Sequence, residues 1–243
     1  MKLKFMCRQC LLENAPEGGG YFTMPYDPNS IVELTDSYYY EFTCRKGHKN
    51  MFFLALPRYA ILFDMGISAY LDGYYREAVM DFAASYERFH EYCINLILWN
   101  EKSLQTDDLT ILWKRMSHQS ERQLGAFTAL YYKQLGDLPD EFSQKAVEFR
   151  NKVTHRGYFP TREEAYSFAL NVAEYVKAII PKLSEHYGFD PRGNYPALRI
   201  AHEKGIGVEG HVHMTVITQY SCGNDFDESI EMFKKQFHNN YEK

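Results

Sequence analysis

The sequence predicts a mainly α-helical protein with a small β segment at its N-terminus. Between residues 57 and 187, apolar side chains recur at three- and four-residue steps, which is the spacing of amphipathic helices. Residues 1–55 instead combine short β-prone runs with turn-rich stretches, and residues 188–243 have a mixed character. We therefore expect three regions, at 1–55, 56–187 and 188–243, of which the last is a small α+β extension.

The composition is that of an ordinary globular protein, with 45% hydrophobic and 24% charged residues among 243, which excludes a disordered chain. The longest apolar run, residues 55–71, is interrupted by Arg58 and Asp64, so we expect no membrane-spanning helix. No signal-peptide core precedes Cys7, and a cytoplasmic location is expected. The net charge of −5 excludes a general basic nucleic-acid binder, so any contact with phosphates requires a local patch.

Short β-prone runs are expected to form strands on both sides of the helical region. A further helix is expected near the C-terminus, at residues 227–238. The expected strands are residues 31–34, 38–44 and 51–56 in the N-terminal region, and 197–201 and 211–219 in the C-terminal region.

The central region is expected to contain several helices. The longest apolar stripe runs from Ala78 to Ile97 and predicts a long amphipathic helix. Thr161 and Glu164 form a capping-box pattern that opens another helix, and Pro181 is expected to kink or end that helix. Further helices are expected at residues 107–116, 121–135 and 140–155, the second of which ends at Gly136.

Four residues near the N-terminus have the spacing of a metal site. Cys7 and Cys10 form a Cys-x-x-Cys pair, and Cys44 and His48 form a second pair around a turn that suits Gly47. Two such pairs are typical of a tetrahedral structural zinc site with no open catalytic position, and the segment resembles a zinc ribbon. Free thiols and a redox dithiol are the alternatives, although no βαβ pattern surrounds the cysteines.

Residues 149–157 carry polar side chains on a helix face that the protein's own core is expected to leave open. Asn151 and His155 point almost opposite to the apolar sector, and Arg150 lies at the edge between them. A histidine transfers protons near neutral pH, and an arginine holds phosphate oxygens in a planar fork, so the set suits phosphodiester chemistry. A solvated polar helix face is the alternative. The apolar sector consists of Phe142, Ala146, Phe149 and Val153.

The same segment resembles the HEPN superfamily, whose members carry an arginine, then four to six residues, then a histidine. Arg150 and His155 are separated by four residues, and Asn151 follows the arginine. An earlier segment, from Gly73 to Glu87, is similar to the family's second helix. The resemblance extends over about residues 57–187. The flanking residues that are similar as well are His155-Arg156-Gly157, the turn at Pro160-Thr161, and Glu163-Glu164-Ala165 at the start of a long helix.

The resemblance implies a HEPN-like bundle of four or five α-helices and a metal-independent endoribonuclease of toxin or phage-defence systems. It also implies an RNA substrate, a homodimer in which two motifs share one cleft, and an antitoxin or activator protein as a further partner. Zinc would be structural, and no catalytic metal is expected. The expected catalytic residues are Arg150, Asn151, His155 and Glu87, where Glu87 orients Arg150 from inside the bundle, and the expected RNA-binding residues are Lys152 and Arg156.

Two other functions stay open at the level of sequence. Some family members have lost activity and only bind RNA, nucleotides or proteins, so a non-catalytic binding module is the first alternative. The second is a zinc-dependent hydrolase that uses His202, His211 and His213, because a His-x-His pair places two imidazoles on one face of a strand. For Glu87, the alternative to orienting Arg150 is that it is an ordinary surface glutamate.

Overall fold

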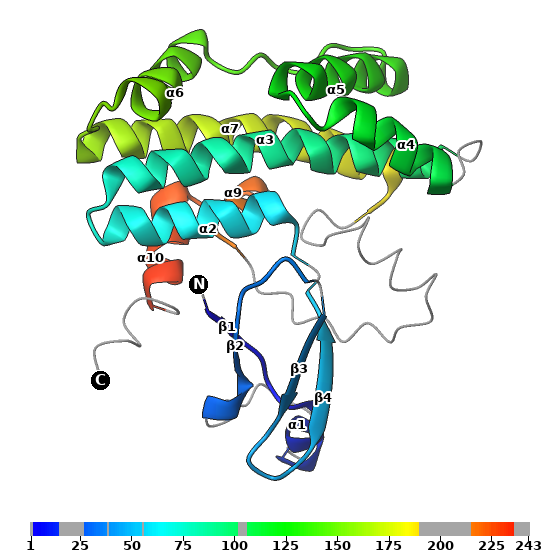
Figure 1. The fold of residues 1–243 in the computed structure, drawn as a ribbon, viewed down its shortest axis with the longest axis vertical. Coiled ribbons are helices and arrows are strands. Elements are labelled where there is room, and N and C mark those ends of the chain that lie inside the picture. The colour runs from blue at the N-terminus through cyan, green and yellow to red at the C-terminus, as the bar shows by residue number, and fades with distance from the viewer. Residues whose placement is uncertain are drawn as a thin grey trace. The chain divides into compact units, whose positions relative to one another are not determined.

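The computed structural model shows a mainly α-helical protein with a small β segment at its N-terminus, as the sequence predicts (Figure 1). The described residues up to 54 form one compact unit, and those from 56 onward form a second. No helix in the described part of the chain is both long and apolar enough to cross a membrane. The structure describes residues 2–14, 27–37, 39–54, 56–101, 106–189 and 215–235.

The first unit contains two antiparallel strand pairs. In the second pair Glu41 lies opposite Met51, and Tyr40 lies opposite Phe52. The three strands expected in this region are confirmed with small shifts of their ends, whereas the sequence did not predict β1 or α1. The elements are β1 (Lys2–Lys4) paired with β2 (Ile31–Glu33), β3 (Tyr39–Thr43) paired with β4 (Lys49–Phe53), helix α1 (Arg8–Asn14) and the 3-10 turn η1 (Pro28–Ser30).

Aromatic side chains form the core of the first unit. Tyr40 and Phe42 point inward from β3, while Glu41 between them is exposed, which is the alternation of a half-buried strand. The ring of Phe5 stacks on that of Phe52 with centroids 4.8 Å apart, and Phe42 stacks on Phe52 at 5.4 Å. Such pairs stabilise beyond the area that they bury, so this small unit has a packed core next to its cysteines.

Helix α3 (Tyr75–Asn100) lies at the centre of the second unit and contacts four other helices. Figure 1 shows α3 and α7 running side by side, with α2 along one side of the pair and α5 and α6 along the other. The helices around α3 are α2 (Arg58–Leu71), α5 (Ser120–Leu135), α6 (Gln144–Arg156) and α7 (Arg162–Tyr187); α4 (Thr106–Met116) packs against α5, and α9 (Val216–Ser221) packs against α2, α7 and α10 (Phe226–Phe233).

The helix ends follow the expected signals in most cases. Gly136 ends α5 in the left-handed conformation with a φ of 72°, and the capping box of Thr161 and Glu164 is present at the start of α7. Helix α6 begins four residues later than expected, because the Ser143 side chain accepts a hydrogen bond from the amide of Ala146 and caps the helix there.

Pro181 was expected to kink or end its helix, and the second of these outcomes is wrong, because α7 continues to Tyr187. A proline inside a helix costs about 3 kcal/mol through its lost hydrogen bond and its clash with the preceding turn. The apolar face on either side of Pro181 is deeply buried and offsets that cost, since burying one large aliphatic side chain contributes about 1.5–3 kcal/mol. The buried side chains are Ile179, Ile180 and Leu183.

The prediction of a strand at residues 211–219 is also wrong for the residues that the structure describes, because Val216–Ser221 is helix α9. The Thr215 side chain caps this helix by accepting from the amide of Thr218, and the amide of Val216 donates to Oδ1 of the buried Asp64 on α2 at 3.0 Å. These contacts override the β propensity of the sequence. The expected terminal helix is confirmed as α10; residues 197–201, 211–214 and 236–238 lie outside the described residues.

Candidate functional site

The two cysteine-histidine pairs of the first unit come together in one buried cluster. Sγ of Cys10 lies 3.8 Å from Sγ of Cys44 and 3.4 Å from Nδ1 of His48, and Sγ of Cys7 lies 3.7 Å from the same nitrogen. All four candidate ligand atoms lie within 4.8 Å of one another. The three sulfur atoms belong to buried residues, whereas His48 is partly exposed.

Local backbone geometry explains why each pair points inward. Gly47 adopts a φ of 84°, which favours glycine, and its amide donates to the carbonyl of Cys44 at 2.8 Å. The amide of Cys44 donates in turn to the carbonyl of His48, so the turn closes on itself. On the other side, α1 begins directly after Cys7, and this helical turn places Cys10 next to it.

A second layer of polar side chains holds His48. Oε1 of Glu13 lies 3.5 Å from Nε2 of His48, and Oε2 of Glu13 accepts a hydrogen bond from Nζ of Lys46 at 3.0 Å. The Asn50 side chain donates to the carbonyl of His48 at 2.9 Å. Because Glu13 faces Nε2, the Nδ1 nitrogen is left to face the sulfur atoms. Glu13 was not among the expected site residues, because it lies one helical turn after Cys10 in α1, a helix that no pattern in the sequence predicted.

The thiols of the cluster have unequal acidities. Burial raises the pKa of Cys10 to about 12, and the adjacent Cys7 and Cys44 sulfurs act in the same direction. Burial also acts to raise the pKa of Cys7, but hydrogen bonds from the Cys10 amide and from the Asn50 and His48 side chains outweigh it and lower the pKa to about 6. Once one thiol of the cluster is ionised, its negative charge opposes the ionisation of the neighbouring thiols unless a cation is present. Three sulfurs with one imidazole form a donor set that Zn²⁺ prefers.

On α6, the structure brings Arg150 and Glu87 together. Nη1 of Arg150 donates to Oε1 of Glu87 on α3 at 3.2 Å, and the two side chains are 23% and 31% exposed. This is the contact that the sequence analysis expected between these residues. A guanidinium has five N–H donors, so a single bond to Glu87 fixes the direction of Arg150 and leaves donors for another oxyanion.

The structure does not bring Arg150 and His155 together within one chain. Five residues on a helix separate their directions by about 140°, so Arg150 turns toward α3 while His155 turns outward and is exposed. Among the described residues, no side chain forms a hydrogen bond, ion pair or ring contact with His155. Asn151 is half-buried, and the core face opposite it is confirmed by the buried Ala146 and Val153.

The two expected RNA-binding cations have different environments. Nζ of Lys152 lies 3.3 Å from the centroid of the Tyr158 ring, and the Tyr158 hydroxyl donates to the carboxylate of Glu164 at 3.0 Å. Arg156 lies in the last turn of α6 and is exposed, without a partner among the described residues. Lys152 is therefore held near the loop that follows α6, whereas Arg156 extends into solvent.

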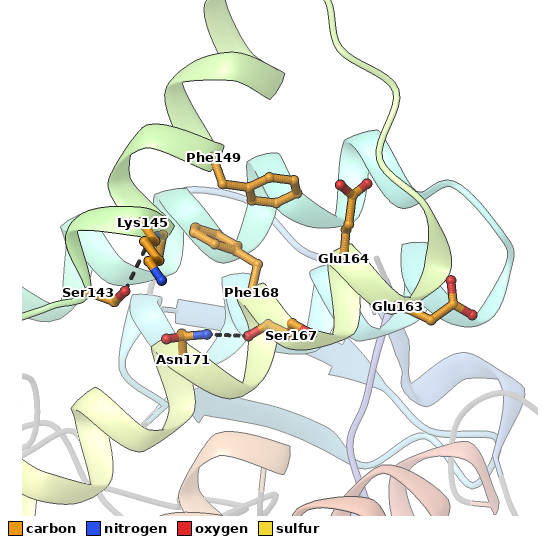
Figure 2. A pocket seen from close by; sticks show the side chains of 9 residues that line it. Ser143, Lys145, Phe149, Glu163, Glu164, Ser167, Phe168 and Asn171 are labelled. Atoms are coloured by element: carbon orange, nitrogen blue, oxygen red, sulfur yellow. Dashed lines mark hydrogen bonds between the residues drawn. The ribbon is translucent and has the colours of Figure 1, made fainter.

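A groove of about 480 Å³ opens between α6 and α7 (Figure 2), and Arg150 is not among the residues that line it. The rings of Phe149 and Phe168 face into it with centroids 5.8 Å apart. Asn151 and His155 do not line this groove either. The sequence analysis did not predict it, because its walls come from two helices whose packing no local pattern reveals. Its other lining residues are Ser143, Lys145, Ala146, Glu163, Glu164, Ser167 and Asn171.

No protein-family model, curated protein or solved structure matches this chain. The fold and both candidate sites are therefore interpreted from the chemistry and geometry of their own residues. Two features stand out: a buried group of three cysteines and one histidine, and a helix that directs an arginine inward and a histidine outward.

Proposed function

We propose that this chain is a metal-independent endoribonuclease of HEPN type that acts as a toxin or phage-defence effector. The observation that carries the proposal is the pair of Arg150 and Glu87, which orients a guanidinium on α6, while His155 of the same helix is exposed and Asn151 is half-buried. A histidine without a partner among the described residues is available to transfer a proton, and an arginine held in place can stabilise the charge that develops on a phosphoryl group.

The proposed reaction is an in-line displacement within the RNA chain. The 2′ oxygen forms a bond to the adjacent phosphorus, and the bond from phosphorus to the 5′ oxygen breaks. His155 transfers a proton in this step, either taking it from the 2′-OH or giving it to the leaving 5′ oxygen. Arg150 holds the phosphoryl oxygens, and Asn151 positions the substrate. The products are a 2′,3′-cyclic phosphate and a 5′-OH, and DNA is left uncut because it lacks the 2′-OH.

A homodimer is part of the proposal because one chain alone directs Arg150 and His155 apart. A two-fold axis near Asn151 would bring two α6 helices together and combine their side chains in one cleft. The exposed Arg156 and Lys152 would then bind phosphates around it. An antitoxin or activator protein that controls the cleft completes the proposed set of partners.

We infer a structural zinc ion at Cys7, Cys10, Cys44 and His48. The buried sulfurs and the imidazole nitrogen meet within 4.8 Å of one another, and Glu13 faces the far nitrogen of His48 as carboxylates commonly do behind a zinc-bound histidine. With four protein ligands the site has no open position, so zinc would stabilise the first unit and take no part in cleavage.

The test of the nuclease is RNA cleavage by the full chain in the presence of EDTA, compared with His155→Ala. The expected result is cyclic-phosphate products from the wild type and none from the variant. His118→Ala is the matched control, because His118 is equally exposed but lies in the turn before α5. Equal cleavage by the wild type and His155→Ala would overturn the proposed chemistry.

The second candidate is a non-catalytic RNA- or protein-binding module of the same fold. The ion pair of Arg150 favours this candidate, since a guanidinium bound to Glu87 can serve the fold alone. A binder has no need of a proton-transfer group, so His155→Ala would then leave every measurable property unchanged. Binding of RNA with the same affinity by both proteins, and no cleavage by either with or without a cellular activator extract, would favour this candidate.

A further inference from the structure

The loop between α6 and α7, residues 157–160, holds an aromatic ring in solvent. Phe159 is 80% exposed, which is the largest exposed fraction among the large apolar side chains that the structure describes. It lies four residues after His155 and three after Arg156. Leaving a phenylalanine ring in water forgoes the stabilisation that its burial would provide, so the fold gains no hydrophobic stabilisation from this side chain.

The backbone that carries Phe159 is nevertheless fixed on both sides. Gly157 ends α6 in the left-handed conformation with a φ of 67°. Tyr158 is held by its hydrogen bonds to Glu164 and by Lys152 over its ring. Pro160 is buried, and the capping box of α7 follows directly. A ring on a fixed loop loses little conformational entropy when a flat partner stacks on it, which favours binding.

The charge next to Phe159 indicates the chemistry of that partner. The last turn of α6 carries His155 and Arg156, and Lys152 lies one turn earlier against the ring of Tyr158. The first turn of α7 carries two carboxylates: Glu164 is already bound to Tyr158 and to the cap of α7, and Glu163 is exposed. An exposed aromatic ring beside cations fits a strand that carries both phosphates and flat bases.

We propose that Phe159 stacks on an unpaired base of the RNA substrate, next to the phosphate that is cleaved. This inference rests on the proposed nuclease function and narrows its substrate class to RNA with unpaired nucleotides. A base inside a duplex is already stacked on both faces and offers no surface to the ring. Lys152 and Arg156 bind the phosphates on either side.

The experiment measures RNA binding on the full chain with His155→Ala, which prevents cleavage during the measurement. The probes are a fluorescein-labelled single-stranded RNA of mixed sequence and the corresponding duplex. We expect Phe159→Ala to weaken single-strand binding about 5- to 150-fold, because stacking contributes about 1–3 kcal/mol per base. Phe159→Trp should retain the affinity. Leu138→Ala is the matched control, since Leu138 is 62% exposed on another loop.

Each outcome decides a different part of the inference. Loss of single-strand affinity in Phe159→Ala but not in Phe159→Trp or Leu138→Ala, with unchanged thermal unfolding, supports it. If the His155→Ala protein binds RNA and Phe159→Ala binds equally well, the role of Phe159 is overturned while the nuclease proposal stands. If Phe159→Ala instead converts a dimer to a monomer, the ring contacts a second copy. If the protein binds no RNA at all, both proposals fail.

Discussion

Oε1 of Glu87 accepts a hydrogen bond from Nη1 of Arg150 over 3.2 Å and joins α3 to α6 across 63 residues of sequence. Both side chains are partly buried, at 31% and 23% exposed, so solvent screens this pair less than an ordinary surface ion pair. Its energetic contribution to folding is still modest. The pair matters more for the orientation of Arg150, because the guanidinium cannot turn away from α3 without losing a charged partner.

We expect Glu87→Gln to lower RNA cleavage about tenfold or more while changing stability little. The amide keeps the size of the side chain but not its charge, so Arg150 is oriented less firmly, and small misplacements of catalytic groups are costly. Cleavage rate and thermal unfolding are the two measurements. Glu91→Gln is the matched control, because Glu91 forms a comparable ion pair with Arg88 on the same helix. Equal cleavage by both variants would contradict a positioning role for Glu87.

The zinc proposal predicts that Cys44→Ser loses the metal and destabilises the first unit. Three remaining ligands cannot close a tetrahedral structural site, and binding of the metal is coupled to folding. Zinc content per chain is the measurement, with Cys222→Ser as the control because that exposed thiol lies in the second unit. Stoichiometric zinc in Cys44→Ser would remove the assignment. Two zinc ions per wild-type chain would instead favour the alternative of a second zinc site at His202, His211 and His213.

Glu13→Gln is expected to weaken zinc binding about 10- to 100-fold without removing a ligand. The carboxylate lies 3.5 Å from Nε2 of His48, so it favours the tautomer that leaves Nδ1 free for the metal. Competition with a chromophoric chelator measures the affinity, and the imidazole nitrogen shifts report the tautomer. Glu41→Gln, on the exposed face of β3, is the control. Unchanged affinity in Glu13→Gln would refute this role even if the wild type binds zinc tightly.

Stability should fall in mild acid because of one buried histidine. Nε2 of His90 lies 2.9 Å from the Tyr175 hydroxyl, and burial lowers its pKa from 6.5 to about 3. Below about pH 6.5 the unfolded chain takes up a proton that the folded chain does not. The free energy of unfolding therefore decreases from about pH 6.5 toward pH 3, by at most about 1.4 kcal/mol per pH unit from this group.

Denaturant unfolding at several pH values checks this expectation. His90→Leu should be less stable at pH 7, because the Tyr175 hydroxyl loses its partner, but its stability should depend less on pH between 6.5 and 3. His118→Ala should keep the pH dependence of the wild type, since that side chain is exposed. An identical pH profile for His90→Leu and the wild type would show that another group is responsible.

Features that depend on one helix or one turn could be predicted from the sequence. The directions of Arg150 and His155 follow from helical geometry, and the left-handed Gly136 and the capping box at Thr161 follow from local signals. The spacing of Cys44 and His48 likewise indicated the ligand pair that the structure places beside Cys10. In each case the physical cause lies within a few residues of the feature itself.

Features that depend on contacts distant in sequence could not be predicted in this way. Helix α9 forms from β-branched residues because the amide of Val216 bonds to Asp64, which is 152 positions away. The strand β1 has only three residues and acquires its partner from β2, so it carries almost no periodic signal. Phe159 belongs to the same class, because only the folded loop shows that its ring stays in solvent.

We expect the proposed RNA cleavage to determine growth of the host cell. Unrestrained expression should halt growth of the host, and both Arg150→Ala and His155→Ala should relieve the arrest. Their losses of RNA cleavage should not add in the double variant, because both groups serve one transition state. Arg150→Lys should not restore full activity, since an ammonium cannot reproduce the planar two-pronged grip on phosphate and would meet Glu87 as a point charge only.

Thermal unfolding of the variants distinguishes a loss of cleavage chemistry from a loss of stability. His155→Ala should unfold at the same temperature as the wild type, because the imidazole is exposed and has no partner among the described residues. Arg150→Ala, in contrast, leaves a partly buried Glu87 unpaired and should lower the free energy of unfolding by about 1 kcal/mol. His118→Ala should still arrest growth. If His155→Ala folds normally, loads zinc and arrests growth as strongly as the wild type, the arrest does not arise from this histidine, and the binding module becomes the better explanation.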